Sequence, residues 1–541
     1  MNRLLEILQS KYASVFCLIF AIGNRIIFTS FYSLIGTDTK IQLTLAQNLM
    51  AGKGMGVTKY FTNNLSVPIF DTQQFYPPGL SLTIIPFLKL FSGDEDTAIL
   101  VFDIIVAIFF IVVIRKLGKK IGLSPALNNV ITLIAGCVQY IFFMAWSSTD
   151  AISLCFVLGA VIKTIDLINK KQNISLLHAT GCGLLFCLPF FFRYMYLPIA
   201  MLLPGFILIA GFLLKNKMLK AGGLKLLAAS AFFLTLLFLF SIYASGNALF
   251  VQDFGRGIFF DQLTTWYPFL PASFISLDFA AQLTEKFLRI TYSRAMLFAE
   301  IVNPILFVLL LILLWRYCGN YKKKQELSNH FLFITIGSSI GITIILLLAY
   351  LTLTYKAIPW GNIRWTHSQH ARYFAFIYVF VPLLMFAGIQ HYAAALKRSF
   401  MRFFVFIGLV CLIIESLHGV YYNVKILLVH KDLDIIRDAD KGYSNFQNII
   451  EEIKKQHPGE EVLICSPDQY YLYAASQMGY KAIFDYKNLW QSEFKVSSKS
   501  ILLMPVHEQE AIIMHDYIEK KKPIVFTTIA GTYFYTEEIN P

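Results

Sequence analysis

Three aspartates have the side-chain type and the position needed for proton transfer beside a membrane. Asp38 directly follows the first long apolar segment, Asp71 precedes a Tyr-Pro-Pro turn, and Asp150 opens a later apolar segment. A carboxylate there can act as a general base, because a polar molecule from the aqueous side can meet a lipid-held one at that level. The alternatives are an interfacial acid or helix N-cap at Asp38 and a plain N-cap at Asp150.

Basic side chains are expected on the same side of the membrane. Arginine suits phosphate because its planar fork donates two parallel hydrogen bonds. Near lipid, an arginine side chain can also extend to the headgroups and have no other role. For Arg193 and Arg372, binding of a substrate phosphate and anchoring to headgroups both stay open. The cations that we select for binding phosphate are Arg193, Arg256, Arg364, His370 and Arg372, with Lys59 in the first polar loop.

The elements that position these residues are mostly apolar. The chain has 541 residues, 57% of them apolar and 15% charged, and its mean hydropathy is +0.60. One soluble core cannot hide so much apolar surface, so we expect membrane-spanning helices of about 20 residues each. The net charge of +13 does not indicate nucleic acid, because the basic residues cluster in short loops, as at 115–120. The eight cysteines show no disulfide framework and no zinc spacing.

One segment decides the topology. Residues 76–91 are apolar but short and interrupted by prolines, and an acidic run follows. If this segment lies flat at the outer interface, the later basic loops and the N-terminus all fall in the cytoplasm, as the positive-inside bias requires. The first span is then 13–35, and the remaining spans are 97–114, 126–145, 151–168, 176–192, 195–214, 224–243, 295–314, 331–351, 373–389 and 403–421.

The predicted fold is a polytopic α-helical membrane protein of about eleven spans with a small C-terminal extracytoplasmic α/β domain. Residues 1–425 form the membrane body, whose first outer loop is 36–96, and residues 426–541 form the soluble domain. In that domain strands at 462–465, 481–484, 500–504 and 523–527 alternate with helices at 432–456, 469–478 and 508–520. This order indicates a small parallel layer, and no glycine-rich phosphate motif opens any of its helices.

With these residues in place, the sequence resembles the GT-C membrane glycosyltransferases, especially the branch of protein O-mannosyltransferases and lipid A aminoarabinose transferases. The resemblance rests on Asp38, on residues 46–54 and on the Tyr76-Pro77-Pro78-Gly79 turn. The stretch 370–373 followed by Pro382, and the pair Arg193-Tyr194, are similar to later family features. The resemblance in layout covers roughly residues 10–420, with few exact residue matches.

The resemblance implies a bacterial inner-membrane enzyme that moves a sugar from a polyprenyl-phosphate donor to a lipid, glycan or protein acceptor outside the cell. Asp38 would be the base, and Asp150 would lie by the site. Two departures matter. The family's second acid after the first span is Thr39 here, which leaves Asp71 as the nearest substitute. The lysine beside the prolines is absent, which leaves the phosphate to Lys59 or the arginines.

The concrete hypothesis is a single inverting transfer in which Arg372 and Arg193 offset the charge of the departing phosphate. No cofactor is assigned, and a divalent metal that shares this charge is left open. One rival is a transporter or flippase of lipid-linked glycans, which predicts polar residues deep within spans. Another is an O-antigen ligase or polymerase, against which the acidic first loop and its Pro-Pro turn argue.

Overall fold

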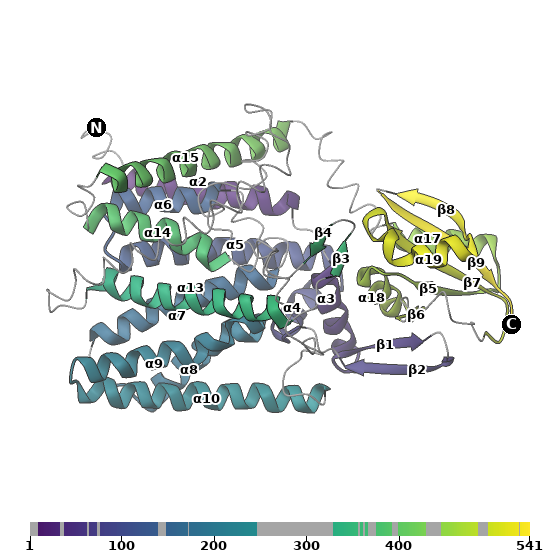
Figure 1. The fold of residues 1–541 in the computed structure, drawn as a ribbon, viewed down its shortest axis with the longest axis horizontal. Helices are drawn as coiled ribbons and strands as arrows, with labels where there is room; N and C mark the ends of the chain where they lie inside the picture. The colour runs from purple at the N-terminus through teal and green to yellow at the C-terminus, as the bar shows by residue number, and fades with distance from the viewer. Residues whose placement is uncertain are drawn as a thin grey trace.

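The computed structural model consists of a bundle of long helices with a mixed β-sheet at one end (Figure 1). The residues that the structure describes are 9–32, 37–61, 64–72, 76–138, 148–170, 173–245, 328–354, 358–360, 363–365, 375–391, 399–428, 445–484, 496–529 and 531–541.

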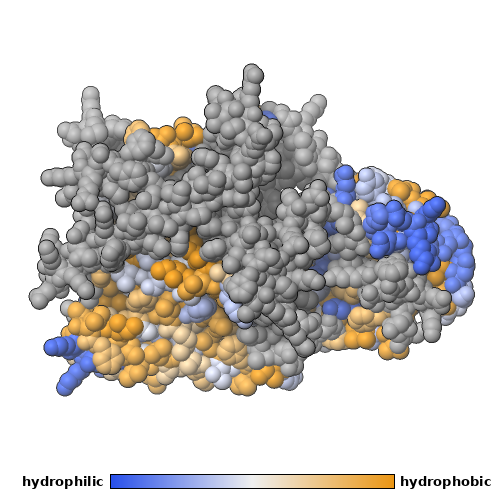
Figure 2. Space-filling model, in the orientation of Figure 1, coloured by the Kyte–Doolittle hydropathy of each residue, from blue (hydrophilic) through white to orange (hydrophobic). Residues whose placement is uncertain are grey.

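The bundle is built from the apolar segments expected to cross the membrane. Its helices are α2 (Lys11–Tyr32), α5 (Glu95–Lys120), α6 (Pro125–Cys137), α7 (Ser148–Lys170), α8 (Leu176–Phe192), α9 (Leu197–Leu213), α10 (Lys217–Ser245), α13 (Asn329–Thr354), α14 (Ala375–His391) and α15 (Ser399–Leu428). A helix satisfies every backbone hydrogen bond within one segment, which an apolar solvent demands. Large apolar side chains also lie exposed on the outside of the bundle (Figure 2), among them Leu177 and Tyr243.

Six helices of the described residues are long and apolar enough to cross a membrane. Shorter apolar helices follow the expected segments at 126–145, 176–192 and 373–389, while the expected span 295–314 lies outside the described residues. The chain is therefore a mostly helical polytopic protein with a C-terminal sheet, and the count of eleven spans stays a prediction.

The first polar loop contains two helices and a hairpin. Helix α3 (Thr37–Met50) comes first, β1 (Gly56–Phe61) pairs antiparallel with β2 (Asn64–Thr72), and α4 (Gly79–Leu90) follows the Tyr-Pro-Pro turn. Helix α4 has 12 residues with Pro86 inside it. At about 1.5 Å per residue it is roughly 18 Å long, which is too short to cross a hydrocarbon layer of about 30 Å.

The sheet has seven strands in the order β2-β1-β6-β5-β7-β9-β8. The strands β5 (Glu461–Cys465), β6 (Lys481–Ile483) and β7 (Ser500–His507) are parallel, as the sequence predicts. Helices α17 (Phe446–Gln456), α18 (Gln469–Gln477) and α19 (Ala511–Lys521) connect or flank them, and a short 3₁₀ turn (Glu508–Glu510) precedes α19.

The expectation of a purely parallel layer is wrong in two places. Strand β9 (Thr532–Ile539), which sequence reasoning missed, runs antiparallel to β7 and to β8 (Ile524–Ile529). The turn between β8 and β9 contains Gly531 at φ +77°, and a turn this short can only join antiparallel strands. The hairpin β1–β2 also joins the sheet, where Tyr60 pairs with Ile483 and Leu65 packs in the same core as Leu463.

An acidic pair lies where two parallel strands of the sheet end. Asp468 follows β5 and Glu510 follows β7. Burial, and secondly the negative charge of Asp468, raise the pKa of Glu510 to about 8. The folded protein thus holds a proton on Glu510 that the unfolded chain, with a glutamate pKa of about 4.3, has already released at neutral pH.

This pKa shift predicts how stability depends on pH. Because the folded-state pKa is raised, the contribution of Glu510 is fully present below about pH 4.3 and is lost as pH rises towards 8. Glu510→Gln stays neutral at every pH, so its melting temperature should match the wild type near pH 4 and exceed it at pH 9. Thermal unfolding of purified protein at both values measures this. The control is Glu508→Gln, which changes an exposed neighbouring glutamate. If the melting temperatures of Glu510→Gln and the wild type differ by the same amount at both pH values, the prediction is contradicted.

Candidate active site

Asp38 lies in the first turn of α3. This helix lies at the end of the bundle that faces the sheet (Figure 1). The hydroxyl of Tyr76 donates a hydrogen bond to Oδ1 of Asp38. Its Oδ2 lies 4.0 Å from Nη2 of Arg193, and 19% of the side chain is exposed. The positive end of a helix stabilises negative charge in its first turn. Asp38 is thus a carboxylate in a partly accessible position, with one phenol and one guanidinium beside it.

Arg193 makes a second, closer contact with Asp150. Its Nε donates to Asp150 Oδ1 at 2.5 Å and its Nη2 donates to Asp150 Oδ2 at 2.5 Å. Both residues are buried, with 7% and 1% of their surfaces exposed. This two-pronged geometry is the strongest form of the arginine–carboxylate interaction. One guanidinium therefore links both candidate acids.

Local chain geometry explains why these side chains meet. Asp150 lies in the first turn of α7, and Arg193 is the extended residue that ends α8 before the short turn Tyr194–Tyr196 and α9. Pro189 lies in the last turn of α8, and its carbonyl accepts the Arg193 N–H at 2.9 Å. The end of α8 therefore places Arg193 beside the start of α7.

The Tyr76-Pro77-Pro78-Gly79 turn is packed against this same end of α8. A Cβ on Gly79 would lie 2.4 Å from the carbonyl oxygen of Phe191, so only glycine permits the approach. That contact lies two residues before Arg193. It gives a physical reason for the glycine of the turn whose first residue, Tyr76, hydrogen-bonds to Asp38.

The structure therefore brings together three of the residues selected from the sequence, namely Asp38, Asp150 and Arg193. Two others lie in the hairpin: Lys59 of β1 has its ammonium 4.9 Å from the ring centroid of Phe484, and Asp71 of β2 pairs with Val57. Arg364 lies in β4 (Ile363–Trp365), which pairs with β3 (Ile358–Trp360). Arg256, His370 and Arg372 lie outside the described residues.

Two tyrosines near the site have no role in the sequence-based prediction. Tyr76 was noted only as part of its turn. Tyr196 is completely buried, lies close enough to Asp150 and Arg193 for their charges to act on it, and its hydroxyl has no hydrogen-bond partner among the described residues. Tyr196 follows Arg193 by three residues in the turn that ends α8, whereas Tyr76 reaches Asp38 only through a tertiary contact, for which its spacing in the chain carries no signal.

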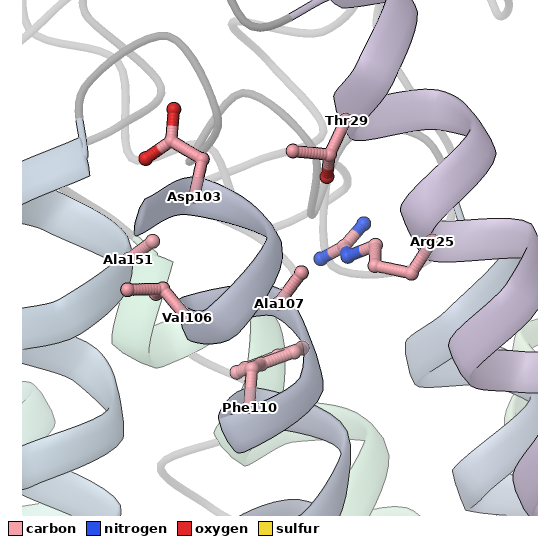
Figure 3. Close-up of a pocket in the computed structure, with 7 residues that line it drawn as sticks. All are labelled: Arg25, Thr29, Asp103, Val106, Ala107, Phe110 and Ala151. Carbon is pink, nitrogen blue, oxygen red and sulfur yellow. The ribbon is translucent and has the colours of Figure 1, made fainter. Parts of the chain in front are cut away.

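A small pocket with both charged and apolar lining residues lies within the bundle beside the start of α7 (Figure 3). Arg25 and Thr29 of α2 and Asp103 of α5 line it, each at most 6% exposed, together with Ala151 and the Phe110 ring. The cavity measures about 30 Å³, and the Arg25 guanidinium lies 5.4 Å from the Phe110 ring centroid. Charged side chains inside apolar segments usually mark a function. Both charges are visible in the sequence within the expected spans 13–35 and 97–114, and neither was selected as a site residue.

The described residues contain no group of three or more His, Cys, Asp or Glu side chains that could hold a metal. At the described site, Asp38 and Asp150 both direct oxygens towards Arg193. Among these three side chains, the Arg193 guanidinium is the positively charged group that both carboxylates face.

No family model and no curated protein matches the sequence. Solved structures do match. ArnT from Cupriavidus metallidurans in the apo state is 13% identical over 97% of this chain and 98% of that one, with a TM-score of 0.43.

An oligosaccharyltransferase from Archaeoglobus fulgidus, in complex with Zn and sulfate, is 12% identical over 91% of this chain and 67% of that one (TM-score 0.49). The archaeal oligosaccharyltransferase AglB from the same organism, in complex with an inhibitory peptide and a dolichol-phosphate, is 11% identical over 92% and 69% (TM-score 0.45). These matches are to GT-C glycosyltransferases, the resemblance that the sequence indicated.

Proposed function

We propose that this protein is an inverting glycosyltransferase that moves a sugar from a polyprenyl-phosphate donor to an acceptor at the membrane surface. The observation that carries the proposal is the partly exposed Asp38 beside the buried Arg193–Asp150 pair, at one end of an apolar helical body. A base open to water and a cation at the lipid boundary are what transfer from a lipid phosphate to a polar acceptor requires.

In the proposed step Asp38 takes the proton from an acceptor hydroxyl or amine. The acceptor atom attacks the anomeric carbon, the bond from that carbon to the phosphate oxygen breaks, and polyprenyl phosphate leaves with the bonding electrons. A phosphate leaving group needs cations rather than a proton near neutral pH. Arg193 is the candidate cation whose side chain lies beside Asp38. Further proposals are Arg372, Arg256, Arg364, His370 and Lys59.

The proposed location is the extracytoplasmic face of a bacterial inner membrane. Helix α7 begins next to Asp150 and ends at Lys170, and α5 begins at Glu95 and ends at Lys119 and Lys120. The site and the basic helix ends thus lie at opposite ends of the same helices. Basic residues favour the cytoplasmic side, which supports an outward-facing site.

The alternative function is a transporter or flippase of lipid-linked glycans, or an O-antigen ligase or polymerase. The buried Arg25 and Asp103 favour the transport alternative, because transporters place charged groups inside the bundle. Asp38 favours transfer, because transport needs no base at the aqueous boundary. Sugar transfer by purified protein in detergent, where no membrane separates two compartments, discriminates between them.

The first prediction concerns the base. Asp38→Asn keeps the size of the side chain and removes its ability to take a proton, so the transfer rate should fall by a factor of about 100 to 10,000 while expression and binding of polyprenyl phosphate persist. Radiolabelled sugar transfer measures the rate. Near wild-type transfer would show that Asp38 is not the base, and Asp71 or Asp150 would be next.

A second prediction separates two roles of Arg193. Arg193→Met leaves Asp150 as a buried unpaired charge and should cost about 3 to 5 kcal/mol of stability. The double variant Arg193→Met/Asp150→Leu removes that charge and should recover most of this stability. If Arg193 also holds the donor phosphate, the double variant still has a raised donor KM, measured beside thermal unfolding. A donor KM equal to that of the wild type would leave Arg193 a structural partner only.

A third prediction tests the orientation. A reporter cysteine at Ser498 in the soluble domain should react with a membrane-impermeant reagent added to intact cells, while one at Lys119 should react only after the cells are opened. The reverse pattern would place the site in the cytoplasm.

A further inference from the structure

Helix α3, which carries Asp38, is held from two sides by different parts of the chain. Towards the membrane body, Asp38 lies 4.0 Å from Arg193, and Lys40 pairs with Glu95 of α5 at 2.6 Å. Towards the sheet, the hydroxyl of Thr37 donates to Asp468 Oδ1 at 3.2 Å. Thr37 directly precedes Asp38, so the soluble domain contacts the chain next to the candidate base.

Asp468 is a well-fixed partner for this contact. Its Oδ1 also accepts the Tyr470 N–H at 2.9 Å, which caps α18. Its own N–H donates to the Ser466 hydroxyl at 3.0 Å, and that hydroxyl donates to the carbonyl of Pro505 in β7 at 2.5 Å. The 7% exposed carboxylate is thereby tied to the end of β5, to α18 and to β7.

A second polar contact joins the other part of α3 to the same helix of the soluble domain. Gln477 in α18 donates to Gln47 Oε1 at 2.6 Å and to Glu95 Oε1 at 2.9 Å. Its own oxygen accepts the Thr44 hydroxyl at 3.3 Å. One side chain therefore connects α3, α5 and α18.

Apolar packing closes the gap between these two polar contacts. Ile41 and Leu45 of α3 form one buried cluster with Tyr473 of α18 and Val57 of β1. The interface thus has an apolar centre with hydrogen bonds at both ends, which is the common arrangement of a specific interface.

We propose that the C-terminal domain positions helix α3 and thereby holds Asp38 against Arg193, with Asp468 and Gln477 as its positioning residues. This inference rests on the proposed function of Asp38. The 4.0 Å separation between the two charged groups is at the outer limit of an ion pair, so a small shift of α3 separates them. A misplacement of about 1 Å can cost roughly a hundredfold in rate. The soluble domain thus contributes to catalysis by positioning α3.

The test weakens both contacts without removing the cap of α18. Thr37→Val/Gln477→Ala deletes the hydrogen bonds of Thr37 and Gln477 and leaves Asp468 in place. In full-length protein, hydrogen exchange over 37–50 should become at least tenfold faster, while exchange in β5 and β7 stays unchanged. The kcat for transfer should fall at least tenfold, with the KM for the donor within threefold of wild type.

Two controls make the outcome specific. Thr37→Ser keeps the hydroxyl and should retain wild-type exchange and kcat. Lys499→Ala removes ion pairs to Glu460 and Glu538 elsewhere in the domain and should change neither. Unchanged exchange over 37–50 in the double variant, or faster exchange spread equally over the sheet, would overturn the proposal. If wild-type protein transfers no sugar, the proposed function fails, and the exchange measurement still decides whether the domain holds α3.

Discussion

The interaction on which the site depends is the buried pair of Arg193 and Asp150. Burying two charges at the edge of a lipid-facing bundle costs several kcal/mol per ion, which only excellent geometry offsets. The two parallel hydrogen bonds at 2.5 Å supply that geometry and fix the start of α7 against the end of α8. Nη2 of Arg193 also lies 4.0 Å from Oδ2 of Asp38. The pair that stabilises the bundle therefore also places a positive charge beside the candidate base.

The first polar loop connects the bundle near the Arg193–Asp150 pair with the soluble sheet. Its Pro-Pro-Gly turn packs on the end of α8, α3 lies between bundle and sheet, and its hairpin continues the sheet of the C-terminal domain. One loop thus contributes to both parts of the molecule. Helix α3, which carries Asp38, is therefore contacted from two sides although it lies outside the apolar helices, where connecting segments are usually more mobile.

The polar groups inside the bundle divide into two kinds. Asn423 donates a hydrogen bond to the side-chain oxygen of Asn24, and Asn24 donates one to the carbonyl of Gly136, which ties α2, α6 and α15 together. Such bonds satisfy groups that lipid cannot. Arg25, Thr29 and Asp103 instead surround a cavity beside the site.

The sequence alone determined the features that depend on local pattern. Apolar runs of membrane length gave the positions of α2, α5, α7, α10 and α13, because only a helix can bury a backbone in lipid. Alternating apolar segments located β5, α18, β6 and β7 within one or two residues at their starts. Asp38, Asp150 and Arg193 were also selected from the sequence, because each adjoins the end of an apolar run.

Only the tertiary structure decided which of these residues meet. The pairing of Arg193 with Asp150 joins residues 43 positions apart, and the contact of Thr37 with Asp468 joins residues 431 apart. The hairpin joined the C-terminal sheet through one parallel pairing with β6, and β9 reversed the direction at the sheet's other side. Sequence periodicity reports which face of an element is apolar, but not which distant element covers it. That choice follows from the packing of the whole chain.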